Sequence, residues 1–308
     1  MTHLLHDSIA GRLSLLSALT LLLGVPAPRA AAQDVPAVTQ HTEAVAAAPP
    51  EEDHETTWNI SAGANLSTGN TRARNVNAGT QLYVLRGSHA LTLQSAFNYG
   101  QADTDGAGPG DYQLTTRNLN SRVRYDAFLT ANDALFVAVA HRWDSLAGLQ
   151  TRLQVQAGYL RNLIKNDNTR AWIEAGYDFT FDNRQNSPGR RVICSEDDVT
   201  NMVGGCTRVV RNFQNIHALR LFYGLTHKFS DDVRVATGLE FLINMNQLAG
   251  GEADAFEDIR VNWETTLNAR LIERLALEVK FRLQYDRVPA ATQEVDTNTL
   301  ISVIYTLL

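Results

Sequence analysis

Apolar and polar residues alternate with a period of two in long runs that cover most of the chain. Within residues 233–247, Leu239 and Phe241 fall on one face, and Arg234 and Glu240 fall on the other. A period of two puts successive side chains on opposite faces of a strand, whereas a helical face repeats about every 3.6 residues. The pattern therefore predicts twelve strands, at residues 57–68, 73–86, 89–101, 113–128, 134–145, 150–164, 169–182, 213–229, 233–247, 258–272, 275–288 and 296–307.

The run lengths and the connections between runs favour a membrane barrel over a soluble sandwich, which would show the same period. Strands of soluble proteins usually have about 5–6 residues, and the run at 213–229 is far longer. Connections after even-numbered runs are short, such as Gly87-Ser88, and the longest, residues 183–212, follows an odd-numbered run. This parity is typical of barrels with short periplasmic turns. We predict an all-β fold: a transmembrane antiparallel β-barrel of bacterial outer-membrane type, with about twelve strands.

The N-terminal part of the chain has a different composition. In residues 1–32, Arg12 precedes an apolar stretch and an Ala30-Ala31-Ala32 site, which predicts a cleaved secretory signal peptide, with a retained anchor as the alternative. Residues 33–56 are rich in Ala, Pro and acidic residues and predict a disordered tether. The barrel then occupies residues 57–308, and the predicted location is the bacterial outer membrane.

The charge of the chain narrows the function classes. A formal net charge of −6 argues against a large nucleic-acid-binding surface. On the inward-facing parity, basic and acidic residues nearly cancel, which favours a lumen braced by ion pairs over a strongly ion-selective pore, with a solute path as the alternative. The predicted lumen charge network consists of Arg122, Arg124, Arg142, Glu174, Asp178, Arg220, Glu240, Arg260, Glu264, Arg270, Glu278, Lys280 and Arg282.

Two further groups of residues are predicted from their parity. Phe136, Leu160 and Trp172 face inward near the short-turn end of neighbouring strands, and a barrel of about twelve strands is narrow enough for them to form a constriction. Arg72, Arg74 and Arg117 face outward at the opposite end, where lipopolysaccharide phosphates would lie. Simple solvation of these arginines is the alternative.

Cys194 and Cys206 are the only cysteines, and both lie in the longest connection of a chain predicted to be exported. A disulfide is the natural interpretation, with a metal site or free thiols as alternatives. Acidic residues in this loop and near Asp103 form no complete calcium-binding pattern, so no metal or cofactor is predicted. His141 lies near Asp144 and Ser145 in sequence, but the opposite parity of His141 and Asp144 argues against a barrel hydrolase and indicates that the protein is not an enzyme.

Several segments resemble one bacterial family. These are Leu66-Ser67-Thr68-Gly69-Asn70-Thr71, Leu135-Phe136, Gly158-Tyr159, the stretch from Trp172 to Tyr177, and the closing Tyr305. In order and spacing they are similar to the salt-induced outer-membrane proteins, domain of unknown function 481, over residues 57–308. The resemblance implies an outer-membrane barrel without known catalytic residues. The last run also resembles the signal read by the barrel-assembly machinery during biogenesis.

Together these features predict a passive role. The favoured function is a narrow or gated pore, or an envelope structural protein that the resemblance links to osmotic or salt stress. The alternative is a surface receptor or adhesin that acts through the disulfide-closed loop 183–212, and a barrel hydrolase is the weakest candidate. The sequence does not identify a solute or a protein partner.

Overall fold

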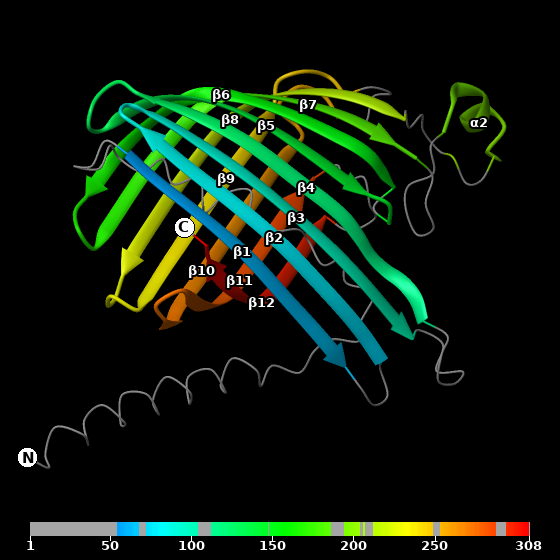
Figure 1. Ribbon diagram of the computed structural model, residues 1–308. Helices are drawn as coiled ribbons and strands as arrows, with labels where there is room; N and C mark the ends of the chain where they lie inside the picture. The colour runs from blue at the N-terminus through cyan, green and yellow to red at the C-terminus, as the bar shows by residue number, and fades with distance from the viewer. Residues whose placement is uncertain are drawn as a thin grey trace, which may run out of the picture. The chain divides into compact units, whose positions relative to one another are not determined.

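The computed structural model describes residues 54–67, 72–103, 112–146, 148–185, 194–203, 206, 212–248, 253–287 and 294–307. Within these ranges, twelve antiparallel strands follow one another around a closed barrel, and β12 pairs with β1 to complete it (Figure 1). The strands are β1 His54–Ser67, β2 Arg72–Arg86, β3 His89–Asp103, β4 Tyr112–Phe128, β5 Asp133–Asp144, β6 Leu149–Lys165, β7 Thr169–Arg184, β8 Phe213–Lys228, β9 Val233–Asn244, β10 Ile259–Ile272, β11 Leu275–Asp286 and β12 Val295–Thr306.

Each predicted run corresponds to one strand, so the predicted fold class is confirmed. The largest differences lie at strand ends: β1 begins at His54, inside the predicted tether, and β9 ends at Asn244 instead of 247. The predicted signal peptide and the tether up to residue 53 lie outside the described residues. One short helix is described, α2 (Glu196–Thr200), and no described helix is long and apolar enough to cross a membrane.

The barrel wall is apolar outside and polar inside. In β5, Leu135, Val137 and Val139 are exposed on the outer face, and the alternating Phe136 and Ala138 are buried in the interior. The largest buried polar side chains also face the lumen, among them Arg124, Arg220 and Glu240. Closure gives each strand a partner on both sides, which removes the sheet edges that hydrocarbon cannot solvate. An apolar exterior around a polar interior defines a transmembrane β-barrel.

The two ends of the barrel differ in their connections. We call the end with the short connections, such as Gly87-Ser88 between β2 and β3, the turn end, and the opposite end the loop end. Residues near the start of an odd-numbered strand after β1, such as Phe136 in β5, lie at the turn end. Residues near the end of such a strand, such as Asp144, lie at the loop end.

Candidate functional site

An apolar cluster occupies the lumen at the turn end. The predicted constriction residues Phe136, Leu160 and Trp172 lie together in it, and all three are almost fully buried. The neighbouring strands add further side chains to the same cluster, which are Tyr83, Leu85, Ala90, Phe128, Ala134 and Phe222. The rings of Trp172 and Phe222 lie 6.0 Å apart. The cluster therefore fills lumen space against the walls formed by β2 to β8.

Glycines on adjacent strands make room for the two largest rings. A Cβ atom on Gly224 would lie 2.2 Å from Cζ2 of Trp172, and one on Gly158 would lie 2.9 Å from Cε1 of Phe136. Gly224 and Trp172 are register partners on β8 and β7, as are Gly158 and Phe136 on β6 and β5. The absence of a side chain on one strand thus sets the position of the ring on the next.

We expect Gly224→Ala to destabilise the barrel by about 1–3 kcal/mol, the usual cost of overpacking, because the rigid Trp172 ring must move. Thermal unfolding, followed as loss of the compact form on gels, measures the effect. In a Trp172→Ala background the same substitution should be nearly neutral. An equal loss in both backgrounds would mean that the ring does not depend on Gly224.

A belt of buried ion pairs adjoins the apolar cluster. Arg124 pairs with Asp126 at 2.7 Å and with Glu174 at 3.0 Å, and Arg220 pairs with Glu174 and with Glu240, both at 2.6 Å. These residues come from β4, β7, β8 and β9, so the belt bridges separate strands across the lumen. The guanidinium carbons of Arg124 and Arg220 also lie 4.3 Å and 5.3 Å from the centre of the Phe136 ring.

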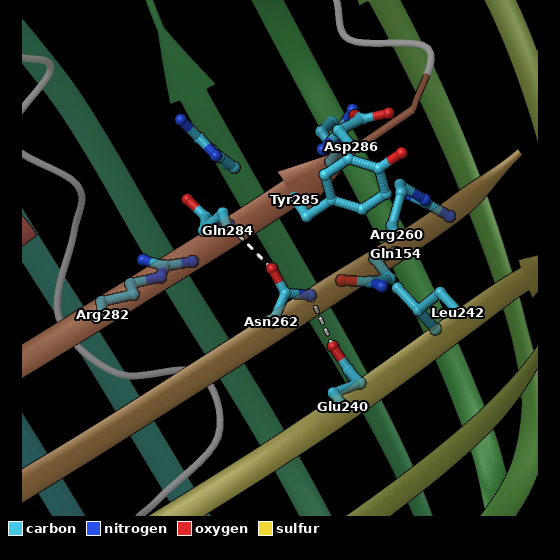
Figure 2. A pocket seen from close by; sticks show the side chains of 11 residues that line it. Gln154, Glu240, Leu242, Arg260, Asn262, Arg282, Gln284, Tyr285 and Asp286 are labelled. Atoms are coloured by element: carbon cyan, nitrogen blue, oxygen red, sulfur yellow. Dashed lines mark hydrogen bonds between the residues drawn. The ribbon is translucent and has the colours of Figure 1, made fainter. Parts of the chain in front are cut away.

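Beyond the belt, toward the loop end, the lumen contains a small hollow (Figure 2). The lining residues are Arg142, Arg152, Gln154, Glu240, Leu242, Arg260, Asn262, Arg282, Gln284, Tyr285 and Asp286. Within it, Gln284 donates to Asn262, and Asn262 donates to Glu240, each at 2.9 Å. The lumen is therefore apolar at the turn end, charged in the middle, and hollow toward the loop end.

Most residues of the predicted charge network face this lumen and are buried there. Arg122 donates to Gln156 at 3.0 Å, Lys280 pairs with Glu278 at 3.1 Å, and Arg260 lies 3.9 Å from Asp178. Arg282 and Glu264 are also buried inside the barrel.

The prediction for Arg270 is wrong. Its side chain is 47% exposed and pairs at 2.9 Å with Asp232, which is itself 63% exposed. Arg270 lies near the end of β10, where the register shifts between Arg270 and Ile272. Its parity is correct, but its height places it in the turn-end region outside the packed lumen.

The network predicted from the sequence does not include Arg152, which makes a bidentate ion pair with Asp182, with both hydrogen bonds 2.6 Å long. Arg152 alternates with the outward Leu153, so its parity was the available signal. A register shift between Leu149 and Thr151 just before it interrupts the period at that point.

Two of the residues predicted to contact lipopolysaccharide, Arg74 and Arg117, lie on the outer face at the loop end. Arg74 is exposed, its guanidinium lies 4.4 Å from the Tyr112 ring centre, and it donates to Gln101. Arg117 is exposed beside Trp143, at 5.2 Å. The side chain of Arg72 lies outside the described residues.

The predicted disulfide between Cys194 and Cys206 is confirmed. Between the two cysteines, Ser195 caps α2 through a capping box with Asp198. The pKa of the Asp198 carboxyl lies below its ordinary value because the backbone N–H and the hydroxyl of Ser195 donate to it. This stabilisation of the cap is present above the pKa of the unfolded chain and is lost as the pH falls through the lower folded pKa.

Replacing Cys194 and Cys206 with serine should loosen the loop and leave the barrel nearly unchanged. The loop-entropy model assigns about 2–3 kcal/mol to so short a closure, and the disulfide joins no two strands. We expect a glutamate-specific protease to cut after Glu196 many times faster in the variant, at an unchanged thermal midpoint of the barrel. A large fall in that midpoint would contradict a purely local role.

The structure does not assemble the hydrolase candidates. Nε2 of His141 lies 2.9 Å from the Thr151 hydroxyl on the outer face, whereas Asp144 is buried in the lumen and pairs with Arg142. The hydroxyl of Ser145 donates to the carbonyl of Arg117. Among the described residues, no group of three or more His, Cys, Asp or Glu side chains is arranged to hold a metal ion.

Comparisons with solved structures find other barrels. A NanC porin is 10% identical, with a TM-score of 0.41 and coverage of 81% of this chain and 97% of that chain. An outer membrane channel from Pseudomonas putida F1 is 13% identical, with a TM-score of 0.43 and coverage of 83% and 98%. The outer membrane channel DcaP of Acinetobacter baumannii is 7% identical, with a TM-score of 0.36 and coverage of 82% and 96%. Likenesses this distant do not indicate a solute for this chain. A comparison with curated proteins gives no match.

The fold and the polar lumen define the class of this protein as a transmembrane β-barrel. Within that class, the family model described as "Protein of unknown function, DUF481" matches residues 60–307, and the chain belongs to this family.

Proposed function

We propose that the protein is a passive outer-membrane channel with a narrow lumen that the apolar cluster closes or gates at the turn end. The observation that carries this proposal is the division of the lumen into a hollow, a charged belt and an apolar cluster inside a lipid-facing wall. Barrels of about eight strands are filled by side chains and those of about 16–18 hold an aqueous channel, so a twelve-stranded barrel lies between the two. A protein that only strengthened the envelope would not need a polar hollow.

Planar-bilayer recording of the purified full chain tests this function. We expect small single-channel steps, or a closed state that opens when the cluster is truncated. If neither the wild-type protein nor a cluster-truncated variant conducts, the channel proposal fails and an envelope structural role remains.

We also propose that Arg74 and Arg117, together with Arg72, bind lipopolysaccharide phosphates at the loop end. The exposed guanidinium groups of Arg74 and Arg117 beside Tyr112 and Trp143 support this, because arginine forks match phosphate oxygens and aromatic residues suit the membrane interface.

Triple replacement of these arginines with alanine should weaken lipopolysaccharide binding by roughly ten-fold or more, the effect of losing charge-assisted hydrogen bonds. Arg161→Ala is the control, because Arg161 is exposed on the outer face at the turn end. Binding of fluorescent lipopolysaccharide to protein in detergent measures the effect. Unchanged affinity in the triple variant would remove this contact.

A further inference from the structure

The hollow at the loop end is lined by four arginines and only two acidic residues. Arg142, Arg152, Arg260 and Arg282 come from β5, β6, β10 and β11, and Figure 2 shows labelled Arg260 and Arg282 among the polar side chains around it. Arginine carries its charge on a planar fork that binds carboxylate and phosphate oxygens through two parallel hydrogen bonds. Several such forks around one space are the donor set that an oxyanion requires.

Two of the carboxylates that pair with these arginines do not line the hollow. Arg142 pairs with Asp144 at 2.8 Å and Arg152 pairs with Asp182 at 2.6 Å, but neither aspartate contributes to the lining. The acidic residue of the belt that does reach the hollow, Glu240, has both oxygens engaged, since Oε1 accepts from Arg220 and Oε2 accepts from Asn262.

Some N–H groups of these arginines donate no hydrogen bond to the described part of the chain. Arg260 is 7% exposed, its Nη2 has no hydrogen-bond partner among the described residues, and a carboxylate oxygen of Asp178 lies 3.9 Å from it. Within the same described part of the chain, Nε of Arg142 also has no hydrogen-bond partner. Leaving a buried charged donor without a hydrogen bond is costly, so these groups favour a ligand that accepts hydrogen bonds.

We propose that the hollow is a binding site for a small solute that carries a carboxylate or phosphate group. Arg260, Arg282 and Arg142 bind the anionic group, and the amides of Gln154, Asn262 and Gln284 face the neutral polar part of the solute. This proposal rests on the proposed channel function and names the class of solute that the channel admits from the loop end.

Isothermal titration of the purified full chain in detergent at low ionic strength tests the site, with inorganic phosphate and acetate as separate probes and a neutral polyol as the control. Binding of one probe alone identifies the preferred oxyanion. Arg260→Gln should weaken binding by roughly ten-fold, the loss of one charge-assisted hydrogen bond. It leaves Asp178 with its hydrogen bonds from Gln154, Gln156 and Thr180, so the fold is kept. Arg282→Gln is the second variant.

The matched control is Arg270→Gln, which removes the same charge from an exposed position outside the hollow. It should bind both probes as the wild-type protein does. Absence of binding by the wild-type protein, or an equal loss in the Arg260 and Arg270 variants, would overturn the site. The titration measures binding even if the protein does not conduct, and bilayer recording in potassium chloride measures conduction without either probe. Failure of the binding site can therefore be told apart from failure of the channel.

Discussion

Replacing Phe136, Leu160 and Trp172 together with alanine should raise single-channel conductance severalfold. The three side chains lie in one buried cluster at the turn end, so truncation widens the lumen where apolar atoms now exclude water and ions. Each truncation of a buried large side chain costs about 2–5 kcal/mol, so the thermal midpoint should also fall. Recording in planar bilayers, on protein that retains the compact form on gels, measures the effect.

The matched control replaces Leu135, Leu163 and Ile173 with alanine. These residues lie on the same three strands near the same end, but all are exposed on the outer face. Conductance should stay at the wild-type value because the lumen is untouched. If the inward and outward triple variants conduct alike, the cluster does not restrict the pore.

Arg220→Met should be the most destabilising single substitution in the lumen. Arg220 is the shared partner of Glu174 and Glu240, and all three side chains are fully buried. Removing one member of a buried ion pair typically costs about 3–5 kcal/mol because a buried charge is left unbalanced. We expect a correspondingly lower urea midpoint for unfolding from detergent micelles or lipid bilayers.

Two control variants separate the effect on stability of burying the ion pair from the effect of losing a charge. Arg270→Met breaks an exposed pair with Asp232 and should cost no more than about 1 kcal/mol. Adding Glu240→Gln to Arg220→Met removes the Glu240 charge that Arg220 balanced, while Glu174 keeps its pair with Arg124, and should recover part of the stability. If the Arg220 and Arg270 variants lose equal stability, the belt does not brace the barrel.

The strands and the facing of their side chains could be predicted because both follow from a period of two. Whether Phe136 or Leu135 enters the lumen depends only on parity, and a closed barrel offers no other core. The lengths of the connections also predict that Trp172 lies at the turn end, and this prediction does not require the register between strands.

The pairing of side chains across the lumen could not be predicted in the same way. Arg124 meets Glu174 from three strands away, and this contact depends on the stagger between strands, which no single run encodes. Local register shifts, such as those after Leu149 and Arg270, also change which inward residue reaches the packed interior. For this reason the sequence indicated a balanced lumen but neither the position of Arg270 nor the hollow near Arg260.

Site-directed spin labelling along β5 tests most directly whether lipid surrounds the barrel and polar residues fill it. Single cysteines at Val137 and Val139 report the outer face, and those at Ala138 and Ala140 report the lumen. The two natural cysteines are joined in the disulfide and do not compete for label. In bilayers, labels at Val137 and Val139 should be relaxed strongly by oxygen and weakly by a water-soluble nickel chelate, and labels at Ala138 and Ala140 should not show that preference for oxygen. Nickel access at Val137 and Val139, with oxygen access confined to Ala138 and Ala140, would contradict the account.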